Sequence, residues 1–144
     1  MTHEDKGHYS KKHADNTKIN ENIKKSIKKM QEDGKLTCSK AFKIVKKHNV
    51  DSLEVGRNAD LLEIRLWQCQ LGLYGYYPNK KIVKPAKEVS KEIKEEIEKE
   101  LVNGKLPCKS AWNIAEKLNI AKIKVSSACE KLGAKIGPCQ LGAF

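Results

Sequence analysis

An internal repeat constrains this chain more than any other feature of its sequence. Residues 20–74 align with residues 90–144 at a constant offset of 70, without a gap, and 18 of the 55 aligned positions are identical. The longest shared stretches are Gly-Lys-Leu-x-Cys, at 34–38 and 104–108, and Cys-Gln-Leu-Gly, at 69–72 and 139–142. Two copies are too few for a repeat array, so each copy is predicted to be one small folding unit.

The first helix of each copy is predicted from apolar residues at helical spacing. They are Ile23, Ile27 and Met30 in the first copy and Ile93, Ile97 and Leu101 in the second. A glycine follows in each copy, Gly34 in the first and Gly104 in the second. We expect these glycines to end the helices, because glycine adopts left-handed backbone at little cost.

A second and a third helix are predicted on either side of a tight turn. The second helix of the first copy is expected to begin at an N-cap, Ser39 or Thr37, and to end near His48. Pro107 precedes its counterpart, at a position where the missing N–H costs little. The turns are expected at 49–51 and 119–121, and the third helices at about 52–62 and 122–132, with Val55, Leu62, Val125 and Leu132 facing inward.

This order of features is typical of helix-turn-helix units. A small residue, Ala41 or Ala111, lets two helices cross closely, and an apolar residue after the turn fills the crossing. The segments that follow the third helices, which begin around Leu66 and Ile136, are expected to form a wing or the edge of a β-hairpin. The predicted fold class is therefore mainly α, with two tandem three-helix repeats and short β segments.

The chain resembles a small group of uncharacterised prokaryotic proteins and accessory domains. Their winged-helix-like or helix-turn-helix units end in Cys-Gln-Leu-Gly followed by an aromatic residue, as residues 69–74 and 139–144 do here. The resemblance covers both copies and implies the fold. It implies no reaction, because that group has no settled one.

The predicted organisation has four parts. They are a flexible N-terminal tail (1–19), the first repeat (20–77), a linker rich in Lys and Pro (78–89) and the second repeat (90–144). The longest uncharged run has only 14 residues, 66–79, whereas a membrane-spanning helix needs about 20 apolar residues. The N-terminus has no apolar core of a signal peptide, so we expect a cytoplasmic protein.

The charge of the chain favours a polyanionic partner. Lys and Arg number 29 against 18 Asp and Glu, for a net charge of +11. A basic excess spread over both repeats and the linker suits nucleic acid, and a merely soluble, Lys-rich surface is the alternative. Only Arg57 and Arg65 are arginines. Because lysine acts as a mobile point charge, any DNA binding is expected to be dominated by the backbone and weakly sequence-selective.

The second copy is expected to make the better nucleic-acid contact. Its third helix carries Lys and Ser, whereas Asp51, Glu54 and Asp60 surround the corresponding helix of the first copy and would repel phosphates. The predicted contacts are Lys122, Lys124, Ser126, Ser127 and Lys131, supported by Arg57, Asn58, Lys80, Lys81 and Lys84.

An aromatic cluster lies next to the linker lysines. It consists of Trp67, Tyr74, Tyr76 and Tyr77. Such side chains stack on unpaired bases in some nucleic-acid-binding proteins. Covering the neighbouring core is the other interpretation, and we prefer it.

The cysteines and histidines suggest no cofactor. Cys38, Cys69, Cys108 and Cys139 are related by the repeat, and a buried, apolar role is expected for them. A disulfide, a four-sulfur zinc site or a reactive thiol at Cys38 is the alternative. His3, His8 and His13 are expected in a solvated tail, with a copper or nickel site at the N-terminus as the alternative.

The sequence contains no recognisable catalytic motif, so we do not expect an enzyme. The predicted function is binding of nucleic acid, most simply double-stranded DNA, as an accessory or regulatory protein. The alternative is a protein-interaction adaptor, with another protein or a second copy as partner, and a metal-linked or thiol redox module is a third hypothesis. No small-molecule substrate and no membrane partner are expected.

Overall fold

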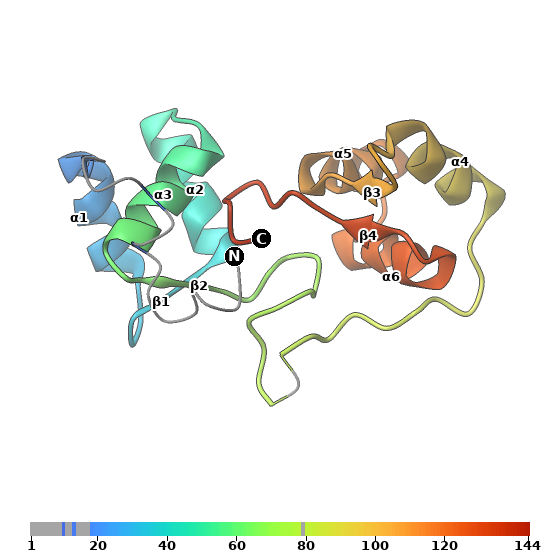
Figure 1. Cartoon of the computed structure of the whole chain (residues 1–144), viewed down its shortest axis with the longest axis horizontal. Coiled ribbons are helices and arrows are strands. Elements are labelled where there is room, and N and C mark those ends of the chain that lie inside the picture. Colours follow the sequence, from blue (N-terminus) through green and yellow to red (C-terminus); the bar gives the residue numbers. More distant parts are fainter. Residues whose placement is uncertain (1–9, 11–12, 14–17, 79) are drawn as a thin grey trace. The chain divides into compact units, whose positions relative to one another are not determined.

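The repeat in the sequence is also a repeat in the structure. The computed structural model describes Ser10, His13 and residues 18–78 and 80–144. Over these residues the chain is mainly helical with a few short strands, which confirms the predicted fold class (Figure 1). The first copy contains α1 (Glu21–Met30), β1 (Lys35–Thr37), α2 (Cys38–His48), α3 (Ser52–Leu61) and β2 (Arg65–Trp67). The second contains α4 (Lys91–Glu100), β3 (Lys105–Leu106), α5 (Cys108–Leu118), α6 (Lys122–Leu132) and β4 (Lys135–Ile136).

Helix ends follow the local chemistry of the sequence. Of the two candidate N-caps of α2, the structure selects Thr37, whose hydroxyl accepts a hydrogen bond from the backbone N–H of Lys40 at 3.2 Å. Pro107 is the N-cap of α5, as predicted. Helices α2 and α5 both end at an asparagine in the left-handed region, with φ of 50° at Asn49 and 53° at Asn119. The short Asn side chain tolerates that backbone, which turns the chain sharply into the next helix.

The two glycines expected to end the first helices lie elsewhere. Helix α1 ends at Met30, and its C-cap residue Gln31 has extended backbone. Gly34 is instead the second central residue of a tight turn between Glu32 and Lys35. Both central residues of that turn have positive φ, 51° at Asp33 and 75° at Gly34. Asn103-Gly104 forms the same turn in the second copy. The helix-end prediction is therefore wrong, because Asp-Gly and Asn-Gly favour two-residue turns of this kind.

The trailing strands do not form the predicted hairpin edge. Strand β2 pairs in parallel with β1, and β4 pairs in parallel with β3. A parallel pair needs a long crossover connection, and the two helices between the strands supply it. The segment expected as a wing is thus joined to the strand that precedes the second helix.

Each copy buries one side of each helix. The fully or almost fully buried residues include Ile23, Ile27, Ala41, Ile44 and Val55 in the first copy and Ile97, Ala111, Ile114 and Val125 in the second. Most of these are the residues expected to face inward. Leu132 is an exception, because it is the last residue of α6 and is 38% exposed.

The compact units of the chain do not coincide with its repeats. Unit 1 comprises Met1–Cys69 and Leu141–Phe144, and unit 2 comprises Gln70–Gln140. The predicted boundary at residue 77 thus differs from the observed one, and the linker 78–89 belongs to unit 2. Each Cys-Gln-Leu-Gly segment is divided: its cysteine stays with its own repeat, and its Leu-Gly pair joins the helices of the other repeat.

The two exchanged segments contact equivalent helix positions. In unit 2, the hydroxyl of Ser126 on α6 donates a hydrogen bond to the carbonyl oxygen of Leu71 at 2.7 Å. In unit 1, the position equivalent to Ser126 is Gly56 on α3, and a Cβ there would lie 1.7 Å from the carbonyl oxygen of Leu141. Leu71 and Leu141 are 0% and 1% exposed. Each repeat therefore completes its core with a leucine from the other.

Candidate nucleic-acid interface

One side of helix α6 presents three of the predicted contact residues. Lys124, Ser127 and Lys131 are spaced three and four residues apart, which puts them on the same side of a helix. Lys124 and Lys131 are exposed, and Ser127 is half-buried. The opposite side of the helix, which includes Val125 and Cys129, is buried in unit 2. The local sequence thus divides α6 into a core side and a polar side.

The linker runs along α6 and brings its own lysines to this surface (Figure 1). The backbone N–H of Ala86 donates to the carbonyl oxygen of Ser127 at 3.0 Å, and Lys81 forms an ion pair with Glu130. Val83, between them, is buried. The linker is therefore fixed to unit 2 rather than being a spacer. We call Lys81, Lys84, Lys124, Ser127 and Lys131 the lysine surface; its four lysines are exposed.

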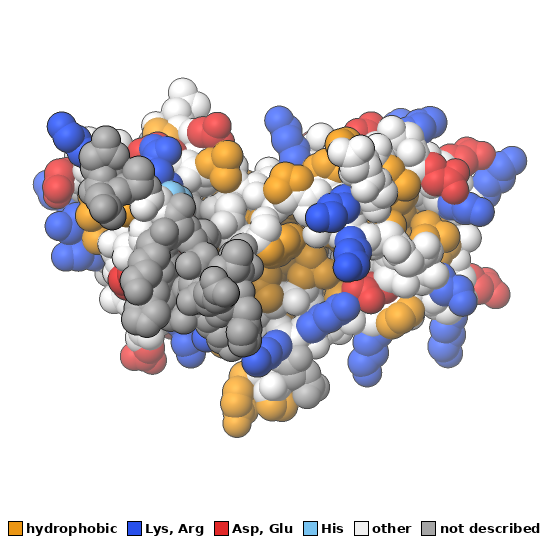
Figure 2. All heavy atoms as spheres, in the orientation of Figure 1, with side chains coloured by type: hydrophobic (Ala, Val, Ile, Leu, Met, Phe, Trp, Pro, Cys, Tyr) orange, Lys and Arg blue, Asp and Glu red, His pale blue; other side chains and the backbone are white. Residues whose placement is uncertain are grey.

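The two segments that form the lysine surface contain few carboxylates of their own. Residues 80–90 and α6 together contain seven lysines and two glutamates, Glu88 and Glu130. Glu130 is engaged by Lys81. Glu88 lines a hollow of about 440 Å³ together with Lys124 and Ser127. Figure 2 shows basic side chains, which in unit 2 are all lysines, with acidic side chains among them, on the face of unit 2 that it displays. The remaining excess of positive charge is suited to a polyanion.

Two predicted contacts are buried and do not belong to the interface. Ser126 is 0% exposed, and its hydroxyl bonds to the carbonyl oxygens of Leu71 and Ile123. Asn58 is also 0% exposed. Its Oδ1 accepts from the N–H of Asn20 at 2.7 Å, and its Nδ2 donates to the carbonyl oxygen of Glu54 at 2.8 Å. Both side chains are fully buried and hydrogen-bonded to backbone groups, so assigning them to nucleic-acid contact is wrong.

Helix α3 of the first copy is largely covered. Arg57 is half-buried and forms an ion pair with Glu54. The side chain of His13 approaches Asp60 with a distance of 2.9 Å between Nε2 and Oδ2, and Ser10 hydrogen-bonds to Glu63. These contacts of Ser10 and His13 lie within the segment predicted as a flexible tail; residues 1–9, 11–12 and 14–17 lie outside the described part of the chain. Helix α3 therefore offers little exposed basic surface.

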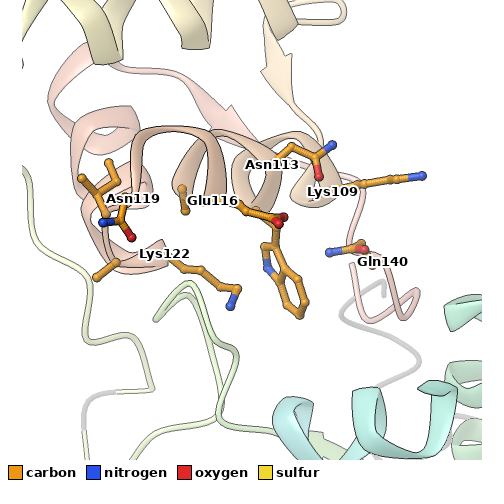
Figure 3. A pocket seen from close by; sticks show the side chains of 10 residues that line it. Lys109, Asn113, Glu116, Asn119, Lys122 and Gln140 are labelled. Atoms are coloured by element: carbon orange, nitrogen blue, oxygen red, sulfur yellow. The ribbon is translucent and has the colours of Figure 1, made fainter. Parts of the chain in front are cut away.

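Lys122 is not part of the lysine surface, because its side chain contacts Trp112 instead. Its Nζ stands 4.5 Å from the centre of the Trp112 ring, a cation–π contact. Both residues line a hollow of about 500 Å³ with Lys109 and Gln140 (Figure 3). Gln140 is held by a hydrogen bond from its Nε2 to the Sγ of Cys108 at 3.4 Å.

Most of the aromatic cluster is half-buried, in agreement with the packing interpretation. Trp67 is flanked by cations, with Lys35 Nζ at 4.4 Å and the Arg65 guanidinium carbon at 5.1 Å from its ring centre. Tyr77 differs, because it is 92% exposed. It lies in the turn that Tyr76 and Lys80 close by a backbone bridge.

All five cysteines are buried thiols. Cys38 and Cys108 are the first residues of α2 and α5, and both are 6% exposed or less. Burial raises the pKa of Cys129 to about 11, with a smaller contribution from Glu130. Within the described part of the chain, no three His, Cys, Asp or Glu side chains gather as metal ligands. His3 and His8 lie outside that part.

Sequence reasoning missed two features of this interface. Lys87 is exposed next to Ala86, the residue that joins the linker to α6. Tyr77 is the exposed aromatic, whereas its neighbours are not. The spacing of residues in the linker carries no signal for either, because the linker's path depends on contacts with a helix about 40 residues later in the sequence.

Comparison of the chain with protein-family models, curated proteins and solved structures finds no match. None of the helices in the described residues has the length and apolar character that a membrane crossing requires.

Proposed function

We propose that this protein binds nucleic acid, most simply double-stranded DNA, through the lysine surface of unit 2, as an accessory or regulatory protein. The observation that carries this proposal is the alignment of two basic segments. The linker is hydrogen-bonded to α6 at Ser127, so that Lys81 and Lys84 accompany Lys124 and Lys131. Phosphates attract such a row of exposed ammonium groups, and their condensed counterions are released on binding.

The expected contact is with the phosphate backbone rather than with base edges. Guanine is read best by the rigid fork of arginine. The two arginines of the chain are both in unit 1, where Arg57 pairs with Glu54 and Arg65 lies over Trp67. Lysine binds phosphate as a mobile charge. We therefore expect an affinity that depends steeply on salt and little on sequence.

The salt dependence of DNA affinity tests this proposal. Fluorescence anisotropy of a labelled mixed-sequence duplex is measured at several salt concentrations with the full chain. Four phosphate contacts predict a loss of affinity of about a hundredfold between 50 and 200 mM salt. The double variant Lys124→Glu with Lys131→Glu should bind at least about tenfold more weakly and show a shallower slope.

A charge-matched control separates a local surface from overall charge. Lys43 and Lys47 are exposed lysines of α2 in unit 1, and Lys43→Glu with Lys47→Glu makes the same change in net charge. We expect this control to bind nearly as well as the wild type. Equal losses in both double variants would reject the lysine surface, and an absence of DNA binding at low salt would reject the function in favour of a protein-interaction adaptor.

A further inference from the structure

Unit 2 contains a hollow of about 500 Å³ that is separate from the lysine surface. Helix α5 supplies Trp112 and Glu116 to its lining, Lys122 is the first residue of α6, and Gln140 follows strand β4. A volume of this size lies within the range of small-ligand sites, about 300–1,000 Å³. Figure 3 shows Lys122 and Gln140 reaching toward the same space from opposite sides. The hollow therefore brings an aromatic ring, both signs of charge and an amide together.

The main feature of the hollow is an aromatic ring with a cation above it. The Nζ of Lys122 lies 4.5 Å from the centre of the Trp112 ring, where the negative face of the ring attracts the ammonium group. Trp112 is half-buried, so packing fixes the ring while part of it lines the hollow. A planar ligand that stacks on the indole would take the place of the ammonium group. That group is then able to bind a negative charge on the same ligand.

The first copy of the repeat shows that the fold does not require these side chains. The positions equivalent to Trp112 and Lys122 are Phe42 and Ser52. Both copies nevertheless form the same three helices in the same order. A smaller ring and a hydroxyl group therefore suffice for the helical unit, and the tryptophan and lysine of the second copy need another cause. Binding of a ligand supplies one.

The polar lining of the hollow suits the edge of a nucleobase. Asn113, Asn119 and Gln140 carry amides, which both donate and accept hydrogen bonds. The carboxylate of Glu116 can accept from an amino group of a base. Gln140 is oriented by the hydrogen bond from its Nε2 to the Sγ of Cys108. The lysine surface, in contrast, offers mainly ammonium groups.

We propose that this hollow binds a single nucleotide, with the base stacked on Trp112 and the phosphate at Lys122. A free nucleotide and an unpaired nucleotide of a nucleic-acid strand present the same base and phosphate, and the test below distinguishes them. Stacking on an aromatic side chain accepts any base, and lysine adds attraction for the phosphate. This inference goes beyond the proposed binding of duplex DNA and does not depend on it, because neither residue belongs to the lysine surface.

Fluorescence titration of the full-length Trp67→Phe variant tests the proposal, because Trp112 is then the sole tryptophan. The probes are adenosine monophosphate and a short single-stranded oligodeoxyadenylate. Stacking of adenine on the indole should quench the emission of Trp112 in a saturable manner. Quenching by adenosine monophosphate shows that a free nucleotide suffices, whereas quenching by the oligonucleotide alone assigns the site to an unpaired base within a strand. No saturable quenching by either probe would overturn the proposal.

Calorimetry with the quenching probe then separates the contributions of the ring and the ammonium group. Trp112→Ala should weaken binding at least about fivefold, and Trp112→Phe should restore part of the loss. Lys122→Gln should weaken binding about tenfold. Lys94→Gln, which changes an exposed lysine of α4 in the same unit, is the matched control and should leave the affinity nearly unchanged.

Equal losses in the two lysine variants would overturn the proposal, as would an unchanged affinity in a folded Trp112→Ala variant. If Trp112→Ala does not fold, the comparison of Lys122→Gln with Lys94→Gln decides. The duplex affinity of Lys122→Gln is measured in parallel by fluorescence anisotropy and should change little. Failure of the nucleotide site is thereby distinguished from failure of the lysine surface.

Discussion

Gly56 of α3 lies against the backbone of Leu141, so that a Cβ on Gly56 would stand 1.7 Å from the Leu141 carbonyl oxygen. A glycine within a helix normally costs about 1 kcal/mol relative to alanine. Here the missing side chain is what lets the C-terminal segment reach the helix. Ser126, at the equivalent position of the second copy, meets the other exchanged segment with a hydrogen bond instead. One duplicated position thus supports the same exchange by two different contacts.

Gly56→Ala should destabilise the protein although alanine is the better helix former. The added methyl group forces the Leu141 backbone away, and overpacking of this kind costs about 1–3 kcal/mol. Denaturant unfolding followed by circular dichroism measures the free energy of unfolding. Gly137→Ala is the control, because a Cβ there meets nothing within 4 Å. A Gly56→Ala variant more stable than the wild type would contradict the contact.

Ser126→Ala should destabilise the protein by about 1–2 kcal/mol. The substitution leaves the buried carbonyl oxygen of Leu71 without the hydroxyl that now donates to it. Ser127→Ala, one residue along α6, is the matched control and should change the free energy of unfolding by less than about 0.5 kcal/mol. Equal effects of the two substitutions would show that the hydrogen bond to Leu71 contributes nothing.

The helices could be predicted well from the sequence, because each helix depends on the spacing of apolar residues within its own segment. Ile23 and Ile27 in α1, and Ala41 and Ile44 in α2, lie at helical spacing in the sequence and are buried in the structure. The parallel pairing of β1 with β2 was not predicted, because it joins residues 30 apart, Lys35 with Arg65, and strands of three residues carry little periodicity. The sequence also contained a usable signal that was misassigned: Asp33-Gly34 is a turn dipeptide, not a helix end.

The candidate site was predicted less completely than the fold. Exposure of Lys124 and Lys131 follows from their positions on an amphipathic helix. Ser126 lies on the buried side of the same helix. Its position next to Val125, which was expected to face inward, could have indicated this. Asn58 carried no such warning, because its burial depends on a partner 38 residues away, the backbone of Asn20.

Asn58→Ala should affect folding rather than nucleic-acid binding. The substitution removes the acceptor for the Asn20 N–H and the donor to the Glu54 carbonyl from a side chain that is itself fully buried. A loss of about 2–3 kcal/mol in the free energy of unfolding is expected. DNA affinity of the folded variant should equal that of the wild type. A variant of wild-type stability with weakened DNA binding would instead indicate that Asn58 contacts the nucleic acid.

The buried thiol of Cys129 should make the stability of the protein fall as the pH rises above about 8.5, where an exposed cysteine ionises. Burial raises the pKa of Cys129 to about 11 in the folded state, whereas an unfolded cysteine ionises near pH 8.5. The unfolded state therefore releases a proton that the native state retains. The resulting stabilisation is present below about pH 8.5 and is lost as the pH rises toward 11.

Cys129→Ala isolates this contribution, because alanine is the residue at the equivalent position 59. The difference in unfolding free energy between wild type and variant should shrink from pH 8 to pH 11. A difference that stays constant over this range would contradict the raised pKa. At pH 8 the native thiol should also resist alkylation until the protein is unfolded.

An NMR titration of the ¹⁵N-labelled full chain with a DNA duplex tests the central claim most directly. If the lysine surface binds the phosphate backbone, the amide signals of Lys81, Lys84, Lys87, Lys124, Ser127 and Lys131 should shift first, and added salt should reverse the shifts. Shifts centred on α3 of unit 1, or no shifts at low salt, would contradict it.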